Sequence, residues 1–175
     1  MAPHSLDIDA LNRATAAEAA GLILPFIERA PVLAAAVAAR RPFADPTALA
    51  DAIRAEILNL STLGRVALFQ GHPELAPPAP ETMTRHSQTE QGRLGLTGLG
   101  PADRARLDDL NLRYRDKFGF PFIAALHRLP NLATLLDTFE RRLAASHDEE
   151  MTRTCEEIAS VSRARVMAAC GMVLS

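Results

Sequence analysis

The chain has 175 residues, 48% of them apolar and 23% charged, which is enough for one domain with a substantial buried core. Its formal net charge of −2, without a polybasic segment, argues against nucleic acid as a partner, and its longest apolar runs are too short to span a membrane. The first residues do not resemble a signal peptide, and the two cysteines form neither a disulfide framework nor a metal motif, so we expect a cytoplasmic protein with reduced thiols.

The first half of the chain predicts four helices. Ala and Leu dominate while Val and Ile are few, which favours helices over strands. Helix starts are marked by a capping box, T-A-A-E beginning at Thr15, and by prolines suited to a first helical turn, Pro31 and Pro46. From these signals and the spacing of apolar residues we predict helices over residues 15–27, 31–41, 46–58 and 62–70.

A long Pro-rich segment, residues 72–86, lacks a helical period and is predicted to be a loop, and long loops in compact domains are often functional. Beyond it the helical pattern returns, interrupted by Gly119 and Pro121. The chain is therefore expected to be all-α, a single-domain bundle of about eight or nine helices over residues 1–175. We predict the later helices over residues 87–96, 101–117, 131–145 and 148–170, with a single helical turn over 123–127.

His72 stands just past a predicted helix, at the start of this loop, and Pro73 stiffens the backbone beside it. A histidine titrates near neutrality and is able to take up or give a proton, so this position suits acid–base chemistry. The alternative is structural, because a histidine at the C-terminal end of a helix is stabilised by the helix dipole. The residues alone leave both explanations open.

The segment S-Q-T-E-Q follows the loop. Ser87 and Glu90 fit a capping box, which is a complete structural explanation of both residues. The same pattern is compatible with function, because the start of a helix presents free N–H groups that attract anions. Gln91 is not used by the capping box, and we expect its amide to be free to bind a carbonyl or urea group.

Arg165 falls on the predicted apolar stripe of the last helix, together with Ile158 and Val161, whereas Arg163 faces away from it. A buried guanidinium requires a partner, either an internal carboxylate or an anionic ligand bound through two hydrogen bonds. Elsewhere the chain has no HxxxH, HExxH or CxxC pattern, no phosphate loop and no GxGxxG. Neither a metal nor a nucleotide cofactor is therefore predicted.

Three of the seven phenylalanines lie in K-F-G-F-P-F-I, residues 117–123, at alternate positions. The first is predicted to continue an apolar helical stripe with Tyr114 and to fill the core, and the glycine after it ends that helix. The proline makes the next link rigid. Where the following helical turn starts, we expect the free N–H groups around Phe122 and Ile123 to face a ligand oxygen.

Together these segments resemble the OHCU decarboxylase (2-oxo-4-hydroxy-4-carboxy-5-ureidoimidazoline decarboxylase) family. The resemblance extends over nearly the whole chain, and its motifs occur in the family's order. One departure is that Pro77 and Pro78 stand where the family usually has Gly. The matching segments are an opening that ends in R-P-F, G-H-P-E-L-A at 71–76, S-Q-T-E-Q-G-R-L-G-L at 87–96, Y-R-D-K-F-G-F-P-F-I at 114–123 and E-I-A-S-V-S-R-A-R-V at 157–166.

The resemblance implies an enzyme that decarboxylates this ureidoimidazoline to (S)-allantoin in urate degradation, without a metal or organic cofactor. It implies catalytic roles for His72 as acid and base, for Glu90 in orienting His72 or accepting a substrate N–H, and for Arg165 in holding charge that develops on the ring. The family is commonly dimeric, so a homodimer is expected. The implied substrate-binding residues are Pro73, Ser87, Gln91, Phe120, Phe122 and Ile123.

Three alternatives remain open on the sequence. The chain could be a non-catalytic all-α ligand-binding or interaction module that retains the same pocket, although the presence of His72, Glu90 and Arg165 counts against this. It could be a different lyase or hydrolase that acts on a related ureido compound. It could also be a metal-dependent enzyme, which an activity that survives a chelator would exclude.

Overall fold

The computed structural model describes residues 5–172, and every regular element in that range is helical. The all-α prediction is confirmed, with nine α-helices and three 3₁₀ turns among the described residues. The α-helices are α1 (Ile8–Arg13), α2 (Ala16–Ile23), α3 (Pro31–Ala38), α4 (Pro46–Leu58), α5 (Thr62–Gln70), α6 (Arg85–Arg93), α7 (Pro101–Phe118), α8 (Leu132–Leu143) and α9 (His147–Ala169). The 3₁₀ turns are Leu24–Phe26, Pro80–Thr82 and Leu126–Arg128.

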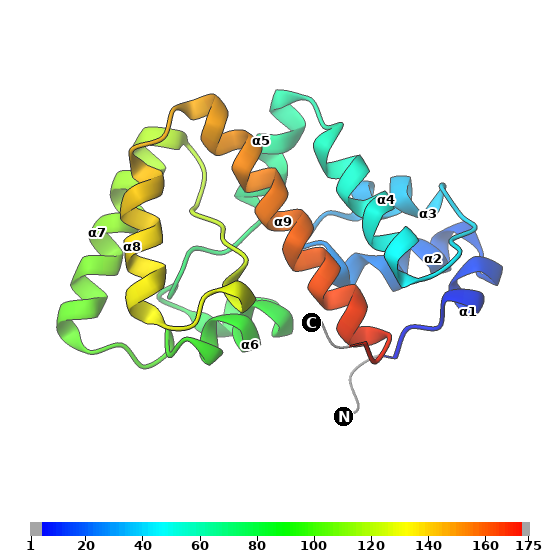
Figure 1. Ribbon diagram of the computed structural model, residues 1–175, viewed down its shortest axis with the longest axis horizontal. Coiled ribbons are helices and arrows are strands. Elements are labelled where there is room, and N and C mark those ends of the chain that lie inside the picture. Colours follow the sequence, from blue (N-terminus) through cyan, green and yellow to red (C-terminus); the bar gives the residue numbers. More distant parts are fainter. Residues whose placement is uncertain (1–4, 173–175) are drawn as a thin grey trace.

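The long helix α9 runs diagonally through the molecule, between two groups of helices (Figure 1). On one side α4 packs along α9, and α3 packs on both α2 and α4. On the other side α7 and α8 lie against each other. Because α9 is covered from both sides, its buried residues include the charged Glu150 and Arg165 as well as Ile158 and Val166.

Short-range signals account for most helix starts. Thr15 forms a reciprocal capping box with Glu18, and the side chain of Asp45 accepts a hydrogen bond of 2.8 Å from the N–H of Ala48. Proline occupies the first position of α3, α4 and α7, where its missing N–H removes no helical hydrogen bond. These three helices and α5 begin at the predicted residues.

Two differences lie near the N-terminus. The sequence did not predict α1, whose N-cap is Asp7 with a hydrogen bond of 2.8 Å from the N–H of Asp9. The helix predicted over residues 15–27 ends at Ile23 and tightens into the 3₁₀ turn Leu24–Phe26. Pro25 explains the change, because it cannot donate the hydrogen bond that an α-helix requires.

The predicted capping box at Ser87 is wrong. The helix begins at Arg85, and its N-cap is Thr84, whose hydroxyl accepts a hydrogen bond of 3.3 Å from the N–H of Ser87. Threonine is also a favoured N-cap residue, so the local signal did not separate the two positions. Ser87 and Glu90 therefore lie inside the helix, and their side chains are available for contacts with other elements.

The aromatic segment packs around Tyr114, which is fully buried and has ring centroids of Phe118, Phe120 and Phe122 at 4.6, 5.9 and 5.4 Å. Gly119 ends α7 in the left-handed conformation, with a φ of +79°, as predicted. The helical turn predicted over 123–127 starts later than predicted: after Gly119 the backbone stays irregular until the 3₁₀ turn Leu126–Arg128.

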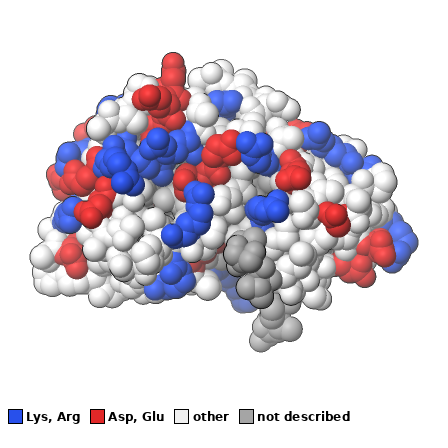
Figure 2. Space-filling view, in the orientation of Figure 1, with Lys and Arg blue, Asp and Glu red and all other residues white. Residues whose placement is uncertain are grey.

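Charged side chains of both signs are intermixed on the face shown in Figure 2, where no extended basic patch stands out. Several of them form exposed ion pairs, including Arg54 with Glu156 and Arg163 with Asp51. Cys155 and Cys170 are both free thiols. Over residues 5–172 no helix has the length and apolar character needed to cross a membrane.

Candidate active site

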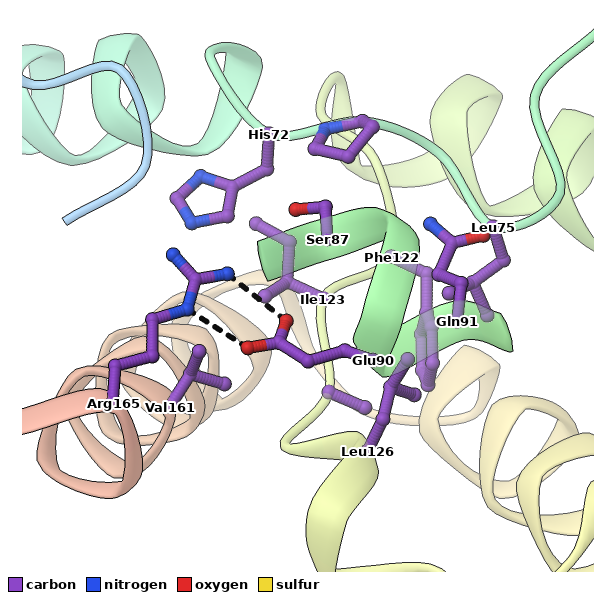
Figure 3. A pocket seen from close by; sticks show the side chains of 12 residues that line it. His72, Leu75, Ser87, Glu90, Gln91, Phe122, Ile123, Leu126, Val161 and Arg165 are labelled. Carbon is purple, nitrogen blue, oxygen red and sulfur yellow. Dashed lines mark hydrogen bonds and ion pairs between the residues drawn. The ribbon is translucent and has the colours of Figure 1, made fainter. Parts of the chain in front are cut away.

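Arg165 extends from α9 toward α6 and forms a two-pronged ion pair with Glu90 (Figure 3). Its Nε donates to Oε1 at 2.8 Å and its Nη2 donates to Oε2 at 2.9 Å. Its Nη1 donates to Oε2 of Glu28 at 3.2 Å. The buried guanidinium therefore has internal carboxylates as partners, one of the two possibilities that the sequence left open. Among the described residues no hydrogen bond joins Glu90 to His72, so Glu90 does not orient the imidazole directly.

Glu28 is a buried member of this site that the sequence did not predict. Besides Arg165, its Oε2 accepts hydrogen bonds from the hydroxyls of Thr84 at 3.0 Å and Ser87 at 3.1 Å. Its Oε1 is buried and has no hydrogen-bond partner among the described residues. A weak signal was present in the sequence, because Glu28 follows the apolar stretch L-I-L-P-F-I, where a solvated acid is not expected.

His72 lies just beyond α5, with Nδ1 2.9 Å from the carbonyl oxygen of Leu68. A carbonyl only accepts, so Nδ1 carries the proton and Nε2 keeps its lone pair. Burial lowers the pKa of His72 to about 4, so the imidazole is neutral at pH 7. Nε2 has no hydrogen-bond partner among the described residues, and the ring points toward Arg165 (Figure 3). The contact with the helix end thus fixes the tautomer and leaves one nitrogen free.

The expectation of a free amide at Gln91 is wrong. Its Oε1 accepts a hydrogen bond of 2.7 Å from the N–H of Ala76, and its Nε2 donates to the carbonyl of Glu74 at 2.9 Å. Asn111 adds a hydrogen bond of 2.9 Å to the carbonyl of Leu75. Gln91 therefore ties the Pro-rich loop to α6, and one N–H and one lone pair of its amide remain for a ligand.

These side chains surround a narrow pocket with a volume of about 40 Å³. Phe120 does not line it, contrary to expectation, because its ring packs on Phe69 at 4.8 Å in the aromatic core. The pocket is lined by His72, Pro73, Leu75, Ser87, Glu90, Gln91, Phe122, Ile123, Ala124, Leu126, Val161 and Arg165.

The backbone of the aromatic segment also contributes to the pocket. The N–H groups of Phe122, Ile123 and Ala124 have no acceptor among the described residues, although these residues line the pocket. They do not start a helical turn as predicted, but they remain donors that a ligand oxygen is able to use. Leu75, Ala124, Leu126 and Val161 were not predicted as pocket residues, because their contribution depends on how the loops and α9 lie around α6.

A second, larger cavity of about 700 Å³ is also bordered by Glu90 and Arg165, and is lined in part by Phe26, Arg85 and Ala168. Within residues 5–172 no group of three His, Cys, Asp or Glu side chains is arranged to hold a metal ion.

A profile of the OHCU decarboxylase family matches residues 12–167. The chain belongs to the OHCU decarboxylase family. It is 37% identical to the 2-oxo-4-hydroxy-4-carboxy-5-ureidoimidazoline decarboxylase of Mus musculus, over 80% of this chain and 79% of that protein. It is 34% identical to the Bos taurus protein of the same name, over 92% and 95% of the two chains.

Two solved structures share the fold of this OHCU decarboxylase family member. The (S)-allantoin synthase structure has a TM-score of 0.74 and 22% identity, and the match covers 94% of this chain but only 53% of that one. The structure of OHCU decarboxylase in the presence of (S)-allantoin has a TM-score of 0.66 and 18% identity, over 80% and 91% of the two chains. At these identities the likeness shows a shared fold alone.

Proposed function

We propose that the protein decarboxylates 2-oxo-4-hydroxy-4-carboxy-5-ureidoimidazoline to (S)-allantoin in urate degradation. One observation carries the proposal: in a member of the OHCU decarboxylase family, a neutral His72 presents an unpaired Nε2 to a pocket walled by the Arg165–Glu90 pair. A base without its proton, beside a fixed cation, is the combination that removal of a hydroxyl proton and stabilisation of ring charge require.

The reaction breaks the bond between ring carbon 4 and the carboxylate. As CO₂ leaves, the electron pair forms a double bond between carbons 4 and 5, and the ring nitrogen that was doubly bonded to carbon 5 takes up a proton. His72 Nε2 takes the proton of the 4-hydroxyl, whose oxygen becomes a carbonyl, and a proton is delivered to one face of carbon 5. One proton is taken up from solvent overall, because an anion becomes neutral allantoin and CO₂. Because the proton reaches carbon 5 from one face only, a single enantiomer of allantoin is formed.

Arg165 uses three of its five N–H groups on the two glutamates, so one N–H on each terminal nitrogen remains for substrate. If Arg165 bound the departing carboxylate, it would stabilise the ground state. We therefore assign these N–H donors to bind charge that develops on the ring. We assign Glu90 to accept a substrate N–H. Ser87 keeps its acceptor lone pairs and Gln91 one donor and one acceptor, which suit the ureido and ring amides.

The apolar part of the proposed binding site is Pro73, Phe122 and Ile123. We further propose that the reaction needs no cofactor and that the protein works as a single-domain homodimer in the cytoplasm. Activity that survives extensive chelation supports the first point. Light scattering of the purified chain tests the dimer, and fractionation of the source cells tests the location.

The decisive assay generates the substrate from urate with urate oxidase and the hydrolase that follows it, and then adds this protein. Fast appearance of optically active allantoin, measured by circular dichroism, is the expected result. Racemic allantoin at the spontaneous rate would refute the proposal and favour a non-catalytic module. Consumption of substrate with a different product would favour another ureido-directed lyase or hydrolase.

A further inference from the structure

A buried ion pair that does not line the pocket joins α8 to α9. Arg142 is 2% exposed and Glu150 is fully buried. Nε of Arg142 donates to Oε1 of Glu150 at 2.6 Å, and the hydroxyl of Tyr114 donates to the same oxygen at 2.5 Å. Thr154 accepts a further hydrogen bond of 3.3 Å from Nη2 of Arg142. This network links the aromatic core to α9.

The same guanidinium reaches two residues that line the pocket. Nη1 of Arg142 donates to the carbonyl of Ile123 at 2.7 Å. Its guanidinium carbon lies 4.4 Å from the centroid of the Phe122 ring, which also stacks on Phe139 at 3.8 Å. Arg142, which does not itself line the pocket, thus contacts both the Phe122 ring and the Ile123 carbonyl.

Peptide geometry turns this contact into a constraint on the pocket. The peptide bond between Ile123 and Ala124 is trans, so its N–H points opposite to its C=O. Because the carbonyl of Ile123 is directed at buried Arg142, the N–H of Ala124 is directed away from Arg142. Ala124 lines the pocket, and its N–H has no acceptor among the described residues. The next N–H, of Ala125, is held by Glu157 at 2.6 Å.

Stability alone is a weak reason for this arrangement. Removing two charges from water is costly, and apolar replacements of a buried ion pair are often neutral or stabilising. Lysine could supply the charge but not the planar fork that contacts Glu150, Ile123 and the ring of Phe122 together. What the pair provides that an apolar pair cannot is a fixed orientation of one peptide group.

We propose that Arg142 is a positioning residue, held by Glu150, that turns the Ile123–Ala124 peptide so that the N–H of Ala124 binds a substrate oxygen. The inference rests on the proposed function for its substrate. It predicts an effect on substrate binding from a side chain that never touches the substrate.

The test compares Arg142→Lys and the double variant Arg142→Met/Glu150→Met with the wild type. The double variant removes both charges together, so it leaves no unpaired buried ion and is expected to stay folded. An exposed pair provides the control, as Arg54→Met/Glu156→Met. We expect KM to rise about tenfold in both Arg142 variants, with kcat within about threefold, and no change in the control. A merely structural role would lower the folded fraction, and with it apparent kcat, at an unchanged KM.

A second readout is independent of turnover: the shift of the Ala124 amide resonance when (S)-allantoin is added. We expect a shift in the wild type that is lost or strongly reduced in the double variant. Wild-type KM and an unchanged Ala124 shift in both Arg142 variants would overturn the inference. If the wild type shows no turnover but the Ala124 shift still depends on Arg142, the proposed reaction fails and the positioning role stands.

Discussion

Arg165 and Glu90 lie 75 positions apart in the sequence, yet their side chains meet in a two-pronged ion pair with distances of 2.8 and 2.9 Å. Only 6% of the Arg165 side chain is exposed, against 28% of Glu90, so the arginine is fixed from behind while the glutamate faces the pocket. Glu28 completes the arrangement from the buried side. Arg165 thus contacts two acids with different surroundings, the buried Glu28 and the partly exposed Glu90. Substitution experiments are able to separate their roles.

His72 is expected to be essential for turnover. His72→Ala and His72→Asn should fold normally and lose about 10²–10⁴-fold in kcat, because acid–base catalysis by Nε2 is removed. The coupled assay for optically active allantoin measures this. His127→Asn is the matched control, since His127 does not line the pocket. A His72 variant with near-normal kcat would remove this residue from the mechanism.

The low pKa of His72 predicts the acid limb of the pH profile. Burial lowers this pKa from 6.5 to about 4, so Nε2 remains a base down to that pH. We expect the kcat/KM profile of the wild type to fall near pH 4, not near pH 6.5. A protonation step near 6.5 that His72→Asn abolishes would contradict the lowered pKa of His72.

The same shift predicts how stability depends on pH. Between pH 6.5 and about 4 the unfolded chain binds a proton at His72 and the folded protein does not, so the free energy of unfolding falls as pH falls through this window. Above pH 6.5 His72 is neutral in both states and contributes no slope. Denaturant titrations at several pH values should therefore show that the free energy of unfolding falls less with decreasing pH for His72→Asn than for the wild type.

Glu28 and Glu90 are expected to differ in what their substitution costs. Glu28→Gln should lower the free energy of unfolding by about 1–3 kcal/mol, because Glu28 is buried and accepts from three side chains. Glu90→Gln should cost less stability and more kcat/KM, since the partly exposed Glu90 lines the pocket. Because Glu90 is not part of a helix cap, Glu90→Ala is also a usable test. Thermal melts and kinetics of the same samples measure both effects. A larger loss of stability in Glu90→Gln, together with a larger loss of kcat/KM in Glu28→Gln, would argue against these roles.

Phe120 and Phe122 offer a matched pair in one segment. Phe120→Leu should lower the free energy of unfolding by about 1–2 kcal/mol and leave KM unchanged, because this ring fills the core beside Phe69. Phe122→Leu should also raise KM, because its ring lines the pocket and carries the Arg142 contact. Equal effects of the two substitutions on KM would show that the rings have no separate roles.

Much of the fold was predictable because the signals are local. Capping by Thr15 and Asp45, proline at first helical positions and glycine after Phe118 each act within a few residues, so the sequence placed those helix ends correctly. The predicted capping box at Ser87 was wrong, because Thr84, three residues earlier, caps this helix. The succession of motifs identified the family, which the profile match confirmed.

The residue pattern was thus sufficient to predict an all-α chain, its family and the residue types of a proposed site. The partners of those residues depend on how distant helices pack together. Arg165 meets Glu28 across 137 positions because α9 packs between two groups of helices, and no local pattern encodes that contact. The same packing ties Gln91 to the loop, turns Phe120 into the core and places Arg142 behind Ile123. Burial then sets the charge state of His72, because desolvation depends on what surrounds the ring.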